Sequence, residues 1–231
     1  HMPGHKGKEP LEFKELAKNL FAFDVTELED TDDLYYPNSF ISESLRDLTM
    51  DRKSTESCYL VNGSTAGILS SIMGLLSPGE KILIESGCHK SVHNAIELKG
   101  LEKITLKQKN HPKGFPLPAS EEEIFEILKN ERSIKMVFLT RPNYYGYVSD
   151  IKRLVDYCNE NHIYTVIDEA HGSHFVYHKD FPISAMELGC SVSINSFHKT
   201  MPSFTQTAVL NLGTLTAEER IQVKSMLQKL Q

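Results

Sequence analysis

From residue 58 onward the chain alternates short apolar stretches with segments whose apolar residues recur at helical spacing, and this alternation limits the fold more than any other feature. The apolar stretches cover residues 58–61, 81–85, 104–106, 135–140, 164–167, 191–194 and 208–212. Most intervening segments are long enough for crossover helices, which connect parallel strands. We therefore predict an α/β fold in which one doubly wound, mostly parallel, seven-stranded sheet carries helices on both faces.

The composition of the 231-residue chain argues against several classes of partner. Its 31 acidic and 25 basic residues give a net charge of −6, and no basic cluster is present that would bind nucleic acid. No apolar run reaches the length of a membrane span, and no secretory signal pattern opens the chain, so we expect a cytoplasmic protein without a membrane partner. The cysteines form no C-x-x-C pair and the histidines no H-E-x-x-H motif, so we expect neither a disulfide framework nor a metal site.

A lysine and an aspartate each follow one of the apolar strands. Asp168 comes directly after residues 164–167, and Lys199 follows residues 191–194 closely. A desolvated lysine is easily deprotonated, and its neutral amine condenses with aldehydes. Taken singly, a strand-end aspartate or a Ser-x-His-Lys run is ordinary loop sequence. Together, an aldehyde-reactive amine and a carboxylate at neighbouring strand ends indicate pyridoxal phosphate.

The turn at residues 62–67 has the composition of a phosphate site. It joins the strand at 58–61 to a helix that contains Ile68, and it carries the hydroxyls of Ser64 and Thr65. Backbone N–H groups at a helix N-terminus bind anions. The turn is neither a Walker loop nor a G-x-G-x-x-G turn, and serine and threonine are also common N-caps.

Two further polar residues, His89 and Asn143, also follow apolar strands. At a strand-to-helix turn the His89 imidazole can stack on a flat ring or cap the helix, and the residue pattern alone favours the cap. Because the carboxyl ends of parallel strands share one edge of a sheet, we expect these two side chains to lie near Ser64, Asp168 and Lys199. Together they match the phosphate, ring face, ring nitrogen and aldehyde of one cofactor.

The N-terminal part of the chain has a weaker pattern. Residues 10–22 are predicted to form an amphipathic helix that packs on the rest of the protein. Residues 24–37 are acidic with aromatic residues at the end, which is typical of a solvated loop; a lid that attracts a cationic substrate is the alternative. We divide the chain into an N-terminal arm and helix segment, residues 1–56, and a large domain, residues 57–231.

Motifs at residues 2–7, 24–28, 32–34, 60–67, 89–92, 168–172 and 196–200 resemble those of the bacterial pyridoxal-phosphate-dependent ornithine/lysine/arginine decarboxylases of fold type I. This resemblance implies the large, cofactor-binding domain of that fold. It implies that Lys199 bonds to the cofactor aldehyde and that Asp168 keeps the ring nitrogen protonated. His89 resembles the ring-stacking histidine. The remaining residues that the resemblance places at the cofactor are Ser64, Thr65, Ala66, Asn143, His171, Ser196 and His198.

The implied activity is decarboxylation of arginine, lysine or ornithine to an amine and CO2, a reaction of polyamine metabolism. The catalytic residues would be Lys199, His89 and Asp168, with either His89 or Lys199 as proton donor. The resemblance also implies a homodimer or an assembly of dimers. The alternatives are another fold-type-I activity, such as transamination, and a cofactor-binding fragment without turnover.

The chain departs from the family pattern at a few positions and in its length. Lys8, Phe197, Asn143 and the pair Ser86-Gly87 stand where the family usually has other residues. Family members continue into a smaller C-terminal domain, so we expect this chain to lack that domain.

Overall fold

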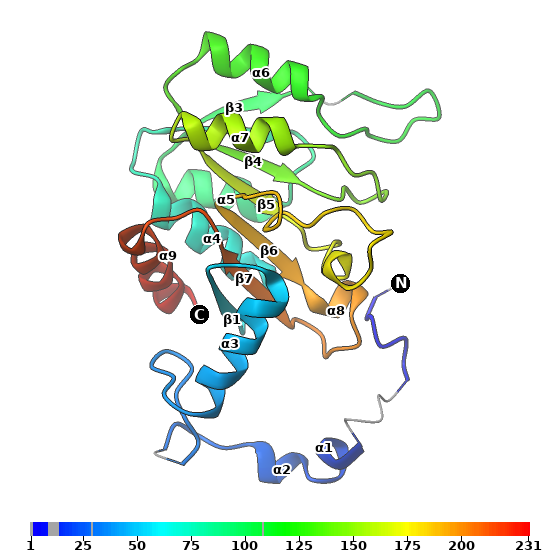
Figure 1. The fold of residues 1–231 in the computed structure, drawn as a ribbon, viewed down its shortest axis with the longest axis vertical. Coiled ribbons are helices and arrows are strands. Elements are labelled where there is room, and N and C mark those ends of the chain that lie inside the picture. The colour runs from blue at the N-terminus through cyan, green and yellow to red at the C-terminus, as the bar shows by residue number, and fades with distance from the viewer. Residues whose placement is uncertain (1, 9–13, 29, 108) are drawn as a thin grey trace.

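The computed structural model describes residues 2–8, 14–28, 30–107 and 109–231, and its centre is a seven-stranded sheet (Figure 1). The strands lie side by side in the order β1-β7-β6-β5-β4-β2-β3. Their bounds are β1 (Glu56–Leu60), β2 (Lys81–Glu85), β3 (Glu102–Leu106), β4 (Ile134–Thr140), β5 (Tyr164–Asp168), β6 (Val192–Ser196) and β7 (Ala208–Leu212).

The sheet is mostly parallel, as predicted. β3, β2, β4, β5 and β6 pair in parallel, whereas β7 is antiparallel to both of its neighbours, β6 and β1. β1 therefore runs in the same direction as the five parallel strands. The carboxyl ends of all strands except β7 consequently meet at one edge of the sheet, where open α/β folds bind ligands.

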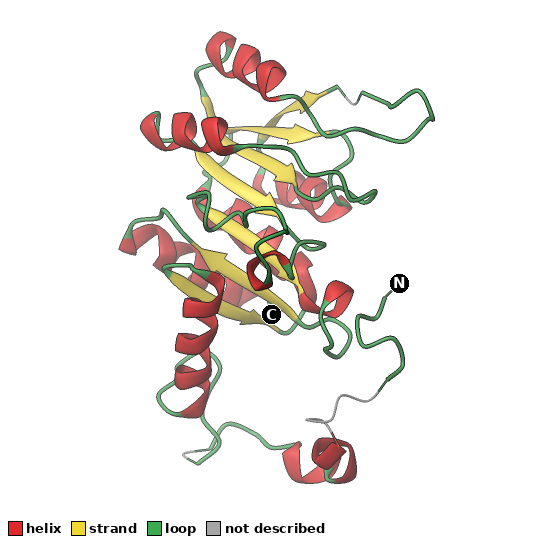
Figure 2. Ribbon diagram, turned by 45° about the vertical axis from the view of Figure 1, so that its right-hand side comes forward, coloured by secondary structure: helices red, strands yellow, loops and turns green. Residues whose placement is uncertain are grey.

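Helices cover both faces of the sheet, which confirms the doubly wound prediction (Figure 2). One hydrophobic core contains Phe138 and Val166 and is covered by α4 (Gly63–Leu75), α5 (Lys90–Lys99) and α9 (Ala217–Leu230). The other contains Val137 and Ile167 and is covered by α6 (Glu121–Asn130) and α7 (Lys152–Glu160). Neighbouring strand residues belong to opposite cores because strand side chains alternate between the two faces.

The N-terminal segment differs from the prediction of one packed helix. Residues 14–23 form two short helices, α1 (Lys14–Lys18) and α2 (Leu20–Phe23), and residues 10–13 lie outside the described part. Leu20 and Phe21 are 63% and 92% exposed, so the predicted packing is wrong for these side chains. Helices this short present no continuous apolar stripe to the sheet.

A longer helix, α3 (Phe40–Arg52), follows the acidic segment and was missed by the sequence pattern. Both carboxylate oxygens of Asp32 accept hydrogen bonds from backbone N–H groups, including those of Ser39 and Ile41 at the start of α3. At its other end, Arg52 donates to the Ser173 carbonyl oxygen at 2.7 Å. Asp32 therefore has a structural role at the helix start, and the division of the chain after residue 56 stays a prediction.

The contact between α4 and α9 is close enough to test by substitution. A Cβ atom at Gly74 would lie 2.9 Å from Val223 Cα, which is backbone and cannot rotate away. Gly74→Ala is expected to lower the free energy of unfolding by about 1–3 kcal/mol because α9 must move outward. Urea denaturation measures this change. Ser225→Ala, on the exposed side of α9, is the control and should change stability by less than about 0.5 kcal/mol; equal effects would contradict the close contact.

Candidate active site

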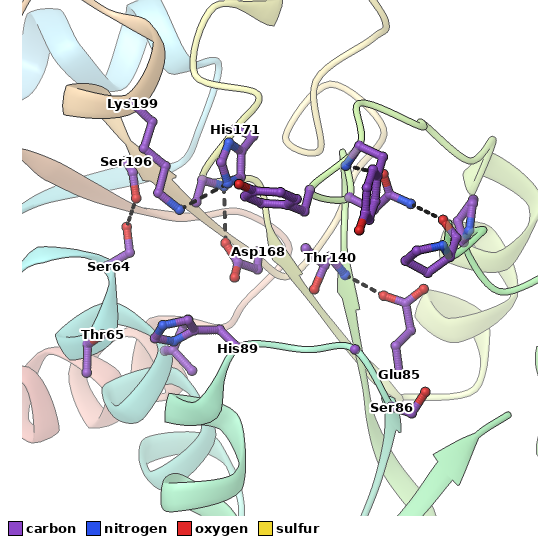
Figure 3. Close-up of a pocket in the computed structure, with 18 of the residues that line it drawn as sticks. Ser64, Thr65, Glu85, Ser86, His89, Thr140, Asp168, His171, Ser196 and Lys199 are labelled. Carbon is purple, nitrogen blue, oxygen red and sulfur yellow. Dashed lines mark hydrogen bonds between the residues drawn. The ribbon is translucent and has the colours of Figure 1, made fainter. Parts of the chain in front are cut away.

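A cavity of about 650 Å³ opens at the shared carboxyl edge of the parallel strands (Figure 3). Segments that follow β1, β2, β4, β5 and β6 all contribute to its wall. The structure brings nine of the predicted site residues into this wall: Ser64, Thr65, His89, Asn143, Asp168, His171, Ser196, His198 and Lys199. Residues far apart in the sequence thus meet because the sheet is parallel.

Lys199 lies in the short helix α8 (Phe197–Thr200), which begins directly after β6. Its Nζ is 3.3 Å from His171 Nε2. Burial lowers the pKa of Lys199, and the negative charge of Asp168 opposes this shift. Burial, reinforced by the positive charge of Lys199, lowers the pKa of His171 to about 4. The imidazole is therefore neutral at physiological pH and can accept a hydrogen bond from the lysine.

Asp168 ends β5 and is only 5% exposed. Its Oδ1 accepts a hydrogen bond from the Ala170 N–H at 3.1 Å. Burial raises the pKa of this carboxyl, while the charges of Lys199 and His89 lower it. A buried carboxylate is stabilised by a cationic or N–H partner, and Asp168 presents its side chain to the cavity.

Two hydroxyls meet at the start of α4. Ser64 Oγ and Ser196 Oγ lie 2.5 Å apart, and Thr65 also lines the cavity there. Asn62, the N-cap residue, makes no side-chain hydrogen bond to the first turn, and Gly63 has the left-handed φ of +66°. The positive end of a 13-residue helix and the hydroxyls beside it are suited to an anion.

His89 is the N-cap of α5, as the residue pattern favoured. Its Nδ1 accepts from the Ser91 N–H at 3.3 Å and lies 2.8 Å from Ser91 Oγ. The imidazole also lines the cavity, on the same side as Thr65 in Figure 3. Capping and ring stacking are thus compatible, and the stacking role stays a prediction.

Asn143 and Ala66 are placed less directly. Asn143 lines the cavity, but its side chain organises the loop after β4: Nδ2 donates to the Pro116 carbonyl oxygen, and Oδ1 accepts from the N–H groups of Tyr145 and Tyr147. The Ala66 side chain is 3% exposed and packs in the core between α4 and the sheet. Only its backbone can face a ligand.

The sequence patterns missed Glu85, Thr140 and Tyr144, which also line the cavity. Glu85 ends β2, and its Oε1 and Oε2 accept from the N–H groups of Ala119 and Thr140 at 3.2 and 2.8 Å. Burial raises the pKa of Glu85, and the charge of Asp168 adds to the shift. The strand-end rule that identified Asp168 would also have identified Glu85 and Thr140.

Within the described ranges, no group of three or more His, Cys, Asp or Glu side chains is arranged to hold a metal ion. The four cysteines are free. Among the described helices, none combines the length and apolar character needed to cross a membrane.

Comparison with known proteins gives a consistent family. The model of the family described as Orn/Lys/Arg decarboxylase, major domain, matches residues 1–230. The protein YaaO of Bacillus subtilis is 34% identical over the whole chain, which covers 49% of YaaO. The arginine decarboxylase of Bacillus anthracis is 31% identical over 92% of this chain and 44% of its own length. This chain therefore spans about half the length of the curated relatives it matches.

Solved structures show the same fold at low sequence identity. The constitutive lysine decarboxylase of Escherichia coli superposes with a TM-score of 0.79 at 17% identity, over the whole of this chain and 35% of that protein. The N-succinyldiaminopimelate aminotransferase of Mycobacterium tuberculosis has a TM-score of 0.71 at 16% identity, over 96% of this chain and 58% of its own. Decarboxylases and aminotransferases thus share this architecture.

The electrostatic link between Lys199 and Asp168 has a measurable consequence. Because burial lowers the pKa of Lys199, its acetylation should reach half-maximum at a lower pH than that of a free lysine, as measured by mass spectrometry across a pH series. Asp168→Asn removes the charge that raises this pKa, so the midpoint should move to still lower pH. Labelling of exposed Lys90 should be the same in both proteins; a midpoint for Lys199 that rises in the variant would contradict the link.

Proposed function

The chain belongs to the Orn/Lys/Arg decarboxylase family, and on this basis we propose that it forms the cofactor domain of a pyridoxal-phosphate-dependent decarboxylase of basic amino acids. The substrate would be arginine, lysine or ornithine, and the products the corresponding amine and CO2. The observation that carries the proposal is the meeting of Lys199, Asp168 and the Ser64–Ser196 pair in one cavity of about 650 Å³.

The residues of the cavity fit pyridoxal phosphate chemically. The N-terminus of α4, with the hydroxyls of Ser64, Thr65 and Ser196, is a neutral donor site for the phosphate. Asp168 offers a buried carboxylate to the ring nitrogen, and Lys199 offers an amine of lowered pKa to the aldehyde. His198, whose Nδ1 lies 3.2 Å from the Thr207 carbonyl oxygen, adds a ring beside the phosphate site.

When bound, pyridoxal phosphate supplies an aldehyde that takes up the substrate amine and a protonated ring that withdraws the electrons left when CO2 departs. Asp168 holds the proton on the ring nitrogen, because its buried negative charge stabilises the neighbouring positive charge. Such an electrostatic contribution is typically a few kcal/mol, or roughly 10²–10³ in rate.

Lys199 has two tasks in this proposal. Its amine anchors the cofactor before substrate arrives, and its lowered pKa keeps part of it neutral and reactive. After the substrate has displaced it, the freed amine is a candidate to deliver a proton to the α-carbon. His89 is the alternative donor, and His171, 3.3 Å from Lys199, can orient the amine.

We further propose that the protein acts in the cytoplasm, in polyamine metabolism, as a homodimer or an assembly of dimers. Family membership supports the basic amino acid substrate. The second candidate function is transamination, favoured by the likeness to aminotransferase structures. The third is a cofactor-binding fragment without turnover, favoured by the match to about half of each curated relative. Assays for CO2 and amine, as opposed to a keto acid, separate these candidates.

Substitution of Lys199 and Asp168 tests the proposed chemistry. Lys199→Ala is expected to abolish CO2 release from the preferred basic amino acid. Asp168→Asn should keep the yellow colour of the bound cofactor but reduce turnover by roughly 10²–10³, because the ring proton is no longer stabilised. Lys179→Ala, at an exposed lysine outside the cavity, is the matched control and should retain turnover. Normal turnover by Lys199→Ala would refute the mechanism.

A further inference from the structure

Thr140 is a cavity residue whose hydroxyl has no hydrogen-bond partner. Within the described residues, six buried side-chain polar atoms lack a partner, and of these Thr140 Oγ1 is the one whose residue lines the cavity. A hydroxyl buried in this way loses its bond to water without replacement, which is unfavourable. Such a group in a cavity wall is explained if a ligand atom completes its hydrogen bonding.

The sheet directs the Thr140 side chain to the same side as Asp168. The two residues are Cα partners in the parallel pair β4–β5, so their side chains leave the sheet on the same face. Figure 3 shows them next to each other, across the cavity from His89. Whatever binds to Asp168 therefore lies within reach of the neighbouring strand end.

Glu85 fixes the Thr140 backbone from the other face. Its neighbour Ile84 belongs to the core beneath α4 and α5, so Glu85 leaves β2 toward α6, where Oε1 accepts from the Ala119 N–H. Its Oε2 accepts from the Thr140 N–H at 2.8 Å. The backbone donor of Thr140 is thus satisfied by protein while its hydroxyl is not, and the strand end is held in place to present that hydroxyl.

We infer that Thr140 is a further cofactor-binding residue and that its hydroxyl hydrogen-bonds to the 3-oxygen on the pyridine ring of pyridoxal phosphate. This inference rests on the proposed function. Pyridoxal phosphate has four polar features: the phosphate, the aldehyde, the ring nitrogen and the 3-oxygen. The Ser64–Ser196 pair, Lys199 and Asp168 serve the first three, and the 3-oxygen is the feature without an assigned partner. Thr140 lies beside the residue assigned to the ring nitrogen.

Two cofactors and three variants test this assignment by fluorescence titration of the cofactor-free protein. Thr140→Val should weaken pyridoxal phosphate binding roughly five- to tenfold, as expected for one lost hydrogen bond, whereas Thr140→Ser should stay within about twofold of wild type. With 3-deoxypyridoxal phosphate, which lacks the oxygen, Thr140→Val and wild type should bind equally. Ser173→Ala removes another unpartnered buried hydroxyl, outside the cavity, and should leave both affinities unchanged.

Thermal unfolding of the cofactor-free proteins provides a readout that does not depend on binding. Removing an unpartnered buried hydroxyl should leave the Tm of Thr140→Val at or above that of wild type. A Tm several degrees lower would show that the hydroxyl supports the protein itself and would overturn the inference. Unchanged affinity of Thr140→Val, or an equal loss with both cofactors, would also overturn it. A wild type that binds no pyridoxal phosphate would refute the proposed function as well.

Discussion

The parallel register of β4, β5 and β6 is the constraint on which the candidate site depends. Thr140 pairs with Asp168, and Asp168 pairs with Ile194, so the strands end at one level of the sheet. This register brings Asp168 and Lys199 into one cavity. Burial then acts in opposite directions on the two groups, raising the pKa of the carboxyl and lowering that of the amine, while their charges partly offset these shifts. The reactivity of the lysine therefore follows from the fold.

The alternation of strand side chains separates the site from its support. Asp168 faces the cavity, and the next residue, Glu169, faces the opposite side of the sheet. There its Oε1 lies 3.6 Å from Arg141 Nη1, with both side chains less than 5% exposed, and Asn195 Nδ2 donates to Oε2 at 3.2 Å. Burial raises the pKa of Glu169 to about 7. This second polar cluster, with Glu85, fixes the strand ends from behind while Asp168 and its neighbours remain directed to the cavity.

The sequence predicted the elements with strong periodicity and the site residues that follow them. The seven strands and the helices between them were recovered because each buries a continuous apolar face. Helix α3 was missed because its pattern is weak: only Leu48 and Arg52 are buried along it. Glu85 and Thr140 were missed for another reason. Their contact joins residues 55 positions apart and depends on strand register, which local sequence does not contain. Similarly, the turn at 62–67 did not reveal that the Ala66 side chain packs in the core.

The central claim is that the amine of Lys199 carries the cofactor. The direct measurement is reduction of the pyridoxal-phosphate-loaded protein with borohydride, which makes the lysine–cofactor bond permanent, followed by peptide mapping by mass spectrometry. The account predicts one labelled peptide, with the modification on Lys199. A label on Lys90, Lys107 or Lys179 in place of Lys199 would contradict the assignment of the cavity and the function proposed for it.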